Sequence, residues 1–119
     1  QWNSGTPIQL SNTTDRHNRN MQIIADGNNG AFVAWVDYDL NLFPSSNDLY
    51  LEHIDASGNT WGTQVQVAGI AGISEHHPSI ALSNDGSELW FMYMQGISSN
   101  SIRIIKLQSS NGTVATDWS

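Results

Sequence analysis

Side chains that could bind or transform a ligand gather in two stretches of each half of this sequence. A neutral imidazole can accept a proton or hydrogen-bond a sugar near pH 7. The flat ring of a tyrosine or phenylalanine can stack on the apolar face of a pyranose. We therefore expect the ligand-binding residues in the following set: Arg16, His17, Asp37, Tyr38, Asp39, Phe43, His76 and His77.

The same residue types also have structural uses. A loop histidine often hydrogen-bonds the backbone, and an aromatic side chain in a repeat often packs between neighbouring sheets. The sequence therefore leaves two interpretations of Tyr38 and Phe43 open, a sugar-stacking surface and ordinary packing.

Catalysis would require more than these side chains. Glycoside cleavage uses two carboxyl groups about 5–10 Å apart across a pocket, whereas Asp37 and Asp39 are two positions apart in one stretch. A sialidase would need a cluster of arginines, but Arg103 falls inside a predicted strand, away from Arg16 and Arg19. We assign no catalytic residue. The alternative is a polysaccharide lyase or glycosidase with one of the histidines of the set as the base.

The spacing of acidic and amide side chains in one segment is typical of a calcium site. Asp37, Asp39 and Asn41 alternate, as oxygen ligands do in calcium loops, and Asp48 stands at the twelfth position. Leu42 occupies the position at which such a loop needs glycine. We predict no metal and no other cofactor, with Asp37, Asp39 and Asn41 as the calcium alternative.

A tandem repeat positions these residues. Trp2, Trp61 and Trp118 are 59 and 57 residues apart, and the segments Gly5–Leu10 and Gly62–Val67 are nearly the same hexapeptide. Repeats of this length stack on one another because a single unit cannot bury both of its faces. The chain divides into repeats 1–59 and 60–119.

Each repeat is predicted to contain four strands, here named A to D in chain order, and no helix. Two apolar runs, 31–36 and 89–94, are typical of strands buried on both faces, and Gly-, Asn- and Asp-rich turns separate the strands. We expect Trp35, Trp61 and Trp90 in the core. The predicted strands are A at 21–25 and 79–82, B at 31–36 and 89–94, C at 48–54 and 101–107, and D at 2–10 and from 61 and 118 onward.

Both repeats resemble the blades of secreted bacterial β-propellers related to the sialidase-like repeat group. The segment Asp55–Trp61 keeps the Gly, Thr and Trp of that group's Asp-box, with its Asp one position early. The resemblance implies an all-β fold of two consecutive four-stranded antiparallel blades. Such blades occur in lectins, adhesion modules, lyases and glycosidases, so the fold alone does not select a function.

The order of strands has two consequences. The D–A and B–C loops share one end of the blades, and the chemically rich segments 11–20, 37–47, 68–77 and 95–99 fall there. The opening D strand lacks a C partner, and the last C strand lacks a D partner. We therefore expect either a fragment of a longer propeller or one protomer of an oligomeric ring.

Charge and composition exclude some partners. A net charge of −7 disfavours nucleic acid, and no apolar run is long enough to cross a membrane. With low Lys and Arg content, the chain is typical of secreted or cell-surface proteins. We expect a non-catalytic extracellular module that binds glycan or protein, with neighbouring blades or identical copies as further partners.

Overall fold

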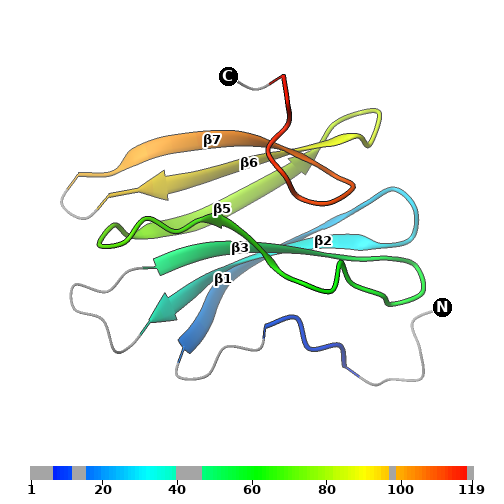
Figure 1. Ribbon diagram of the computed structural model, residues 1–119, viewed down its shortest axis with the longest axis horizontal. Helices are drawn as coiled ribbons and strands as arrows, with labels where there is room; N and C mark the ends of the chain where they lie inside the picture. Colours follow the sequence, from blue (N-terminus) through cyan, green and yellow to red (C-terminus); the bar gives the residue numbers. More distant parts are fainter. Residues whose placement is uncertain (1–6, 12–15, 40–46, 97–98, 118–119) are drawn as a thin grey trace.

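The described part of the chain is all-β, with seven antiparallel strands in two sheets (Figure 1). The structure, a computed structural model, describes residues 7–11, 16–39, 47–96 and 99–117. The first sheet has the order β1-β2-β3-β4 and the second β5-β6-β7. The strands are β1 (Arg16–Ala25), β2 (Ala31–Asp39), β3 (Asn47–Ile54), β4 (Val65–Ala68), β5 (Glu75–Leu82), β6 (Glu88–Gln95) and β7 (Ser101–Gln108).

Aspartates shape the tight turns between the strands. Asp26 Oδ1 accepts hydrogen bonds from the backbone N–H groups of Asn28 and Gly30, at 2.7 and 2.8 Å. Asp55 and Asp85 accept backbone bonds from residues two positions later in their own turns. A side-chain oxygen that satisfies turn N–H groups stabilises the reversal. The aspartates at these three positions thus help to set where the chain reverses.

The first strands of the two sheets carry the same irregularity. The β1–β2 register shifts between Arg19 and Gln22, and the β5–β6 register shifts between His76 and Ser79. Asn20 and His77, 57 positions apart, have positive φ angles of 51° and 54°. A β-bulge with a residue in this conformation redirects the side chains around it. The repeat is therefore visible in the backbone as well as in the sequence.

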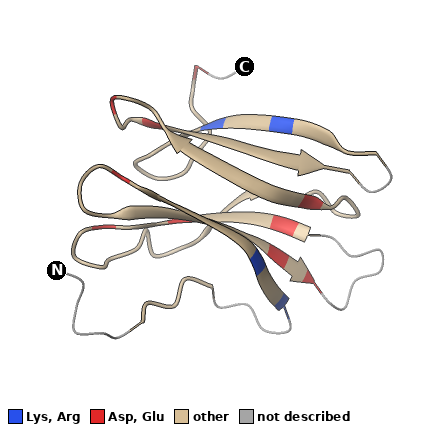
Figure 2. Ribbon diagram, turned by 180° about the vertical axis from the view of Figure 1, so that it is seen from behind, with Lys and Arg blue, Asp and Glu red and all other residues tan. Residues whose placement is uncertain are grey.

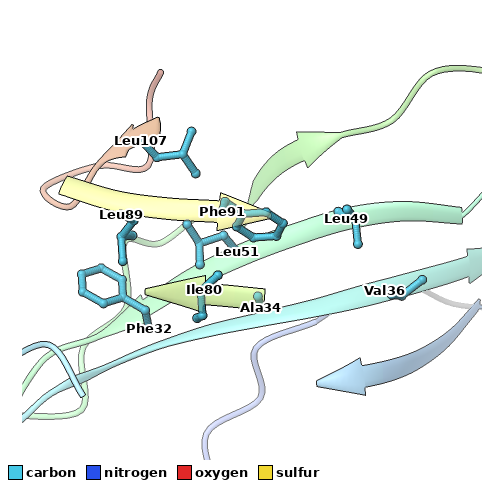
Figure 3. Close-up of a cluster of buried hydrophobic side chains, with 9 residues drawn as sticks. All are labelled: Phe32, Ala34, Val36, Leu49, Leu51, Ile80, Leu89, Phe91 and Leu107. Carbon is cyan, nitrogen blue, oxygen red and sulfur yellow. The ribbon is translucent and has the colours of Figure 1, made fainter. Parts of the chain in front are cut away.

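A cluster of apolar side chains fills the space between the two sheets (Figure 3). Phe91, Leu49, Leu51 and Leu89 have no exposed surface. Burial of such side chains contributes about 1.5–3 kcal/mol each. The full cluster is Phe32, Ala34 and Val36 from β2, Leu49 and Leu51 from β3, Ile80 from β5, Leu89 and Phe91 from β6, and Leu107 from β7.

Each sheet thus has an inner face, which carries these cluster residues, and an outer face, which carries the alternate residues. β5 is the strand of the second sheet that packs against β1, β2 and β3 (Figure 1). On the outer face of the first sheet lie Ile23, Val33, Trp35 and Tyr50. On the outer face of the second sheet lie Trp90, Met92, Met94, Ile102 and Ile104.

The predicted strands B and C of both repeats are confirmed, and strand A is longer than expected. The prediction that 89–94 is buried on both faces was wrong, because only the inner face of β6 is covered. Trp35 is buried, with 3% of its surface exposed, and Trp61 packs against the core, but Trp90 is 37% exposed.

The opening strand was also mispredicted. Residues 7–10 do not form a strand, and residues 1–6 lie outside the described part of the chain. In the second D position, β4 begins at Val65, four residues after Trp61. Within residues 7–11, 16–39, 47–96 and 99–117, no helix has the length and apolar character needed to cross a membrane.

Candidate functional site

One end of the two sheets gathers most of the charged side chains that the sequence singled out. Figure 2 shows acidic segments of β2, β3 and β5 at the same end as the basic segments of β1. The antiparallel register explains this grouping, because Arg16 pairs with Asp39 and Asp37 pairs with Asp48. This end of the molecule is therefore formed by the beginnings of β1, β3 and β5 and by the end of β2.

Arg16 is the centre of an ion-pair network in the first sheet. Its Nη1 lies 3.1 Å from Asp37 Oδ2 and 3.2 Å from Asp48 Oδ2, and its Nη2 lies 3.3 Å from Asp39 Oδ2. Burial alone would lower the pKa of the Arg16 guanidinium, but hydrogen bonds and charges from Asp37 and Asp48 raise it well above its ordinary value. Arg16 thus remains a cation shared by three carboxylates.

Asp37 is the most enclosed member of this network. Its side chain has no exposed surface, and Oδ1 is buried without a hydrogen-bond partner among the described residues. A buried carboxylate depends on its ion pair, because losing the partner leaves an uncompensated charge. Asp37 is therefore a structural partner of Arg16, and a bulky ligand in solvent does not reach it.

The second sheet builds a different arrangement at the same end. Arg103 Nε donates to Gln95 Oε1 at 3.0 Å, and Gln95 Nε2 donates to Glu75 Oε1 at 3.1 Å. Glu75 is fully buried, and its Oε2 has no partner in the described part of the chain. Burial raises the pKa of the Glu75 carboxyl, and the nearby charge of Asp48 raises it further.

A third group, His17, Arg19 and Tyr38, is accessible on the first sheet. His17 pairs with Tyr38 across β1 and β2, and Arg19 Nη2 donates to His17 Nδ1 at 3.3 Å. The guanidinium of Arg19 lies 5.3 Å from the centre of the Tyr38 ring, within the range of a cation–π contact. His17 and Arg19 are exposed and Tyr38 is half-buried. This trio offers hydrogen-bond donors to solvent from a fixed strand scaffold.

The two other histidines of the candidate set lie apart from that trio. The rings of His76 and His77 are 4.9 Å apart in an edge-on arrangement, and His77 lines a groove beside Met92 and Ile102. His76 Nδ1 is buried and has no hydrogen-bond partner among the described residues. The sequence placed His17, His76 and His77 in loops; the structure corrects this, since β1 and β5 begin earlier than predicted and include all three.

The calcium alternative involves residues that Arg16 already engages. Asp37 and Asp39 both bind its guanidinium, while Asn41, like the predicted ligand residue Phe43, lies outside the described residues. In the part of the chain that the structure describes, no group of three or more His, Cys, Asp or Glu side chains could hold a metal ion. The arrangement can bind hydrogen-bonding ligands through the accessible trio.

Sequence reasoning left Asp48, Glu75 and Gln95 out of the candidate set although the structure brings them to this end. Asp48 could have been found from strand pairing, because it stands opposite Asp37 once the β2–β3 turn is known. Gln95 had no such signal, because a glutamine at a strand end is common. Comparisons with protein-family models, curated proteins and solved structures found no match to this chain.

Proposed function

We propose that the two sheets are consecutive blades of an extracellular β-propeller, and that this module binds neutral glycan without transforming it. The observation that carries the binding proposal is the accessible trio of His17, Arg19 and Tyr38. Arg19 contacts both His17 and Tyr38, and the trio combines an exposed imidazole and an exposed guanidinium with a half-buried aromatic ring. Glycan sites commonly combine an aromatic ring with convergent polar groups on a rigid scaffold.

The blade proposal is supported by the way the two sheets stack. The two sheets do not pack through equivalent faces. The residues equivalent to those on the inner face of the first sheet lie on the outer face of the second sheet. Ala34 and Met92 are 58 positions apart and equivalent, yet Ala34 faces inward and Met92 outward. Units related in this way continue in one direction around an axis, as blades do.

A non-catalytic role is supported by the state of the acidic groups. Glu75 has the raised pKa expected of a general acid, but it has no exposed surface, so a polysaccharide cannot contact it. Asp37 is equally enclosed and is bound to Arg16. A pair of carboxyl groups that flank a glycosidic bond must both reach the substrate. Neutral glycan is favoured over acidic glycan because the chain carries a net charge of −7.

A glycan panel tests this proposal. We expect the 119-residue chain to retain neutral oligosaccharides, and Tyr38→Ala to weaken binding by about 1–3 kcal/mol through the lost ring contact. Tyr50→Phe is the matched control, because Tyr50 lies on the outer face of the same sheet, away from the trio. Absence of glycan binding in a panel that includes neutral and acidic oligosaccharides would refute the proposal, as would turnover of a polysaccharide by the purified chain.

A further inference from the structure

The outer face of the second sheet is equivalent, position by position, to the inner face that the first sheet uses to pack. Leu49 and Leu51 of the first sheet are fully buried against the second sheet. Their equivalents 53 positions later, Ile102 and Ile104, are 74% and 48% exposed. Ala34 is likewise fully buried, whereas its equivalent Met92 is 44% exposed. The second sheet therefore displays the same kind of apolar surface that the first sheet uses for packing.

The outer face of the first sheet shows the reverse relation. Ile80 of β5 is 8% exposed because the first sheet covers it, whereas its equivalent 57 positions earlier, Ile23, is 66% exposed. Val33 and Trp35 of this outer face occupy the positions of Phe91 and Tyr93 on the inner face of the second sheet, although Trp35 itself is only 3% exposed. The two outer faces thus have the composition of the two sides of the internal interface. Contiguous exposed apolar side chains of this kind mark interaction surfaces.

The segment 7–11 gives an independent indication of how a neighbour would dock. The methyl end of Ile8 lies beside Gly58, 3.3 Å from where a Cβ on that glycine would be. Val65, the equivalent of Ile8, has the same relation to Gly112, the corresponding turn glycine of the second repeat, at 2.9 Å. Segment 7–11 therefore sits against the first sheet as β4 sits against the second.

β4 has a second contact that segment 7–11 lacks. It pairs with β3, in the register Leu51 with Val65, Tyr50 with Gln66, and Leu49 with Ala68. The equivalent stretch of β7, residues 102–104, has no strand on that side within the described residues. An open edge next to an exposed apolar face is a ready template for another strand.

We propose that a second copy of this chain docks head to tail on the outer face of the second sheet. The second copy covers Met92, Ile102 and Ile104 with the outer face of its own first sheet, and its residues 8–11 join β7 as a fourth strand. The occupant is a second copy because one chain carries both complementary faces and the strand that completes the edge. Such a heterologous contact leaves one further face free at each end.

Sedimentation velocity over a range of protein concentrations tests the docking. We expect the wild-type chain to self-associate, and Ile104→Lys and Ile23→Glu each to be monomeric, because each places a charge on one outer face. Ile70→Lys is the matched control and should associate like wild type, since Ile70 is 51% exposed but belongs to neither face. Circular dichroism of each variant checks that the sheets are intact, and Ile102→Lys replaces any variant that unfolds.

A mixture of the two monomeric variants separates head-to-tail docking from other contacts. Each variant keeps the face that the other has lost, so the mixture should form a dimer that grows no further. A wild-type chain that stays monomeric at every concentration overturns the proposal. Association of either single variant also overturns it and would indicate that like faces pair. A mixture that stays monomeric overturns it as well.

A disulfide tests the predicted strand register directly. The pairing of Tyr50 with Gln66 translates to Arg103 of one copy with Gln9 of the next. The chain has no native cysteine, so Gln9→Cys combined with Arg103→Cys should give disulfide-linked oligomers under mild oxidation. Gln9→Cys with Gln108→Cys lies outside the predicted pairing and should cross-link at least tenfold less. Equal cross-linking of both pairs, or of neither, contradicts the strand addition.

Discussion

The two sheets pair the polar side chains at the same end of their strands in different ways. Asp37 and Gln95 occupy equivalent strand positions, 58 residues apart. In the first sheet the carboxylate at this position binds Arg16, which also binds Asp39 and Asp48. In the second sheet the amide at this position links Arg103 to the buried Glu75. The repeat therefore preserves backbone geometry and leaves the electrostatics of this end free to diverge.

This difference predicts that the stability of the two sheets depends on different factors. The first sheet places the guanidinium of Arg16 among three carboxyl groups. The second sheet holds Glu75 away from solvent, and burial raises its pKa so that the neutral acid is favoured. An ion-pair network is sensitive to loss of its cation, whereas a buried acid is sensitive to pH. These two sensitivities can be tested separately.

Removing the cation of the first sheet should have the largest effect. Arg16→Met keeps the length of the side chain but leaves Asp37 buried without its partner, at a cost of about 3–5 kcal/mol in the free energy of unfolding. Urea denaturation at pH 7, followed by tryptophan fluorescence, measures this loss. Arg19→Met is the control, since Arg19 is exposed and makes no ion pair with a carboxylate among the described residues. Its cost should stay within about 0.5 kcal/mol. Equal losses in the two variants would show that the network contributes nothing specific.

Breaking the amide link of the second sheet should have a smaller effect. Gln95→Leu removes the side-chain hydrogen bond to the buried carboxyl group of Glu75, at a cost of about 1–3 kcal/mol. Because that hydrogen bond lowers the pKa of Glu75, its loss should raise the pKa of this carboxyl further. The destabilisation should therefore grow between pH 4 and pH 8 in urea titrations. A loss that is independent of pH would assign it to packing alone.

Most of the fold was predictable from the sequence because its signals are local. Runs such as 31–36 and turn aspartates such as Asp26 and Asp55 identify strands and reversals without long-range information. Strand ends were harder. Arg16, His17 and Asp39 are polar, so no apolar alternation marks them, and their strands extend only because each has a pairing partner.

The candidate site was predictable only in part, since it depends on pairing across strands. The sequence singled out Arg16, Asp37 and Asp39 as ligand-binding residues, but their mutual ion pairs depend on the β1–β2 register and on its bulge. The contact between Arg19 and Tyr38 depends on the same register. The exposure of Trp90 was unpredictable for another reason, because an apolar run does not show which of its two faces the rest of the fold covers.

Replacing the buried acid of the second sheet should have the smallest effect on stability, and this effect should depend on pH. Because the pKa of Glu75 in the folded protein is raised above its ordinary value of 4.5, the folded state binds more protons than the unfolded state above that pH. The stability of the wild-type chain should therefore fall as the pH rises from about 4.5 through the folded-state pKa. Glu75→Gln cannot ionise, so it should be more stable than wild type at pH 8 and show no gain at pH 4.

Glu88→Gln distinguishes this effect from a general loss of negative charge. Glu88 Oε1 lies 3.1 Å from Lys106 Nζ, so Glu88→Gln removes an ion pair and should give no gain at pH 8. The urea midpoints of the three proteins at pH 4, 6 and 8 measure the comparison. A gain for Glu75→Gln of equal size at all three pH values would contradict the raised pKa. A gain for both variants at pH 8 would assign the effect to the net charge of −7 and not to the buried position of Glu75.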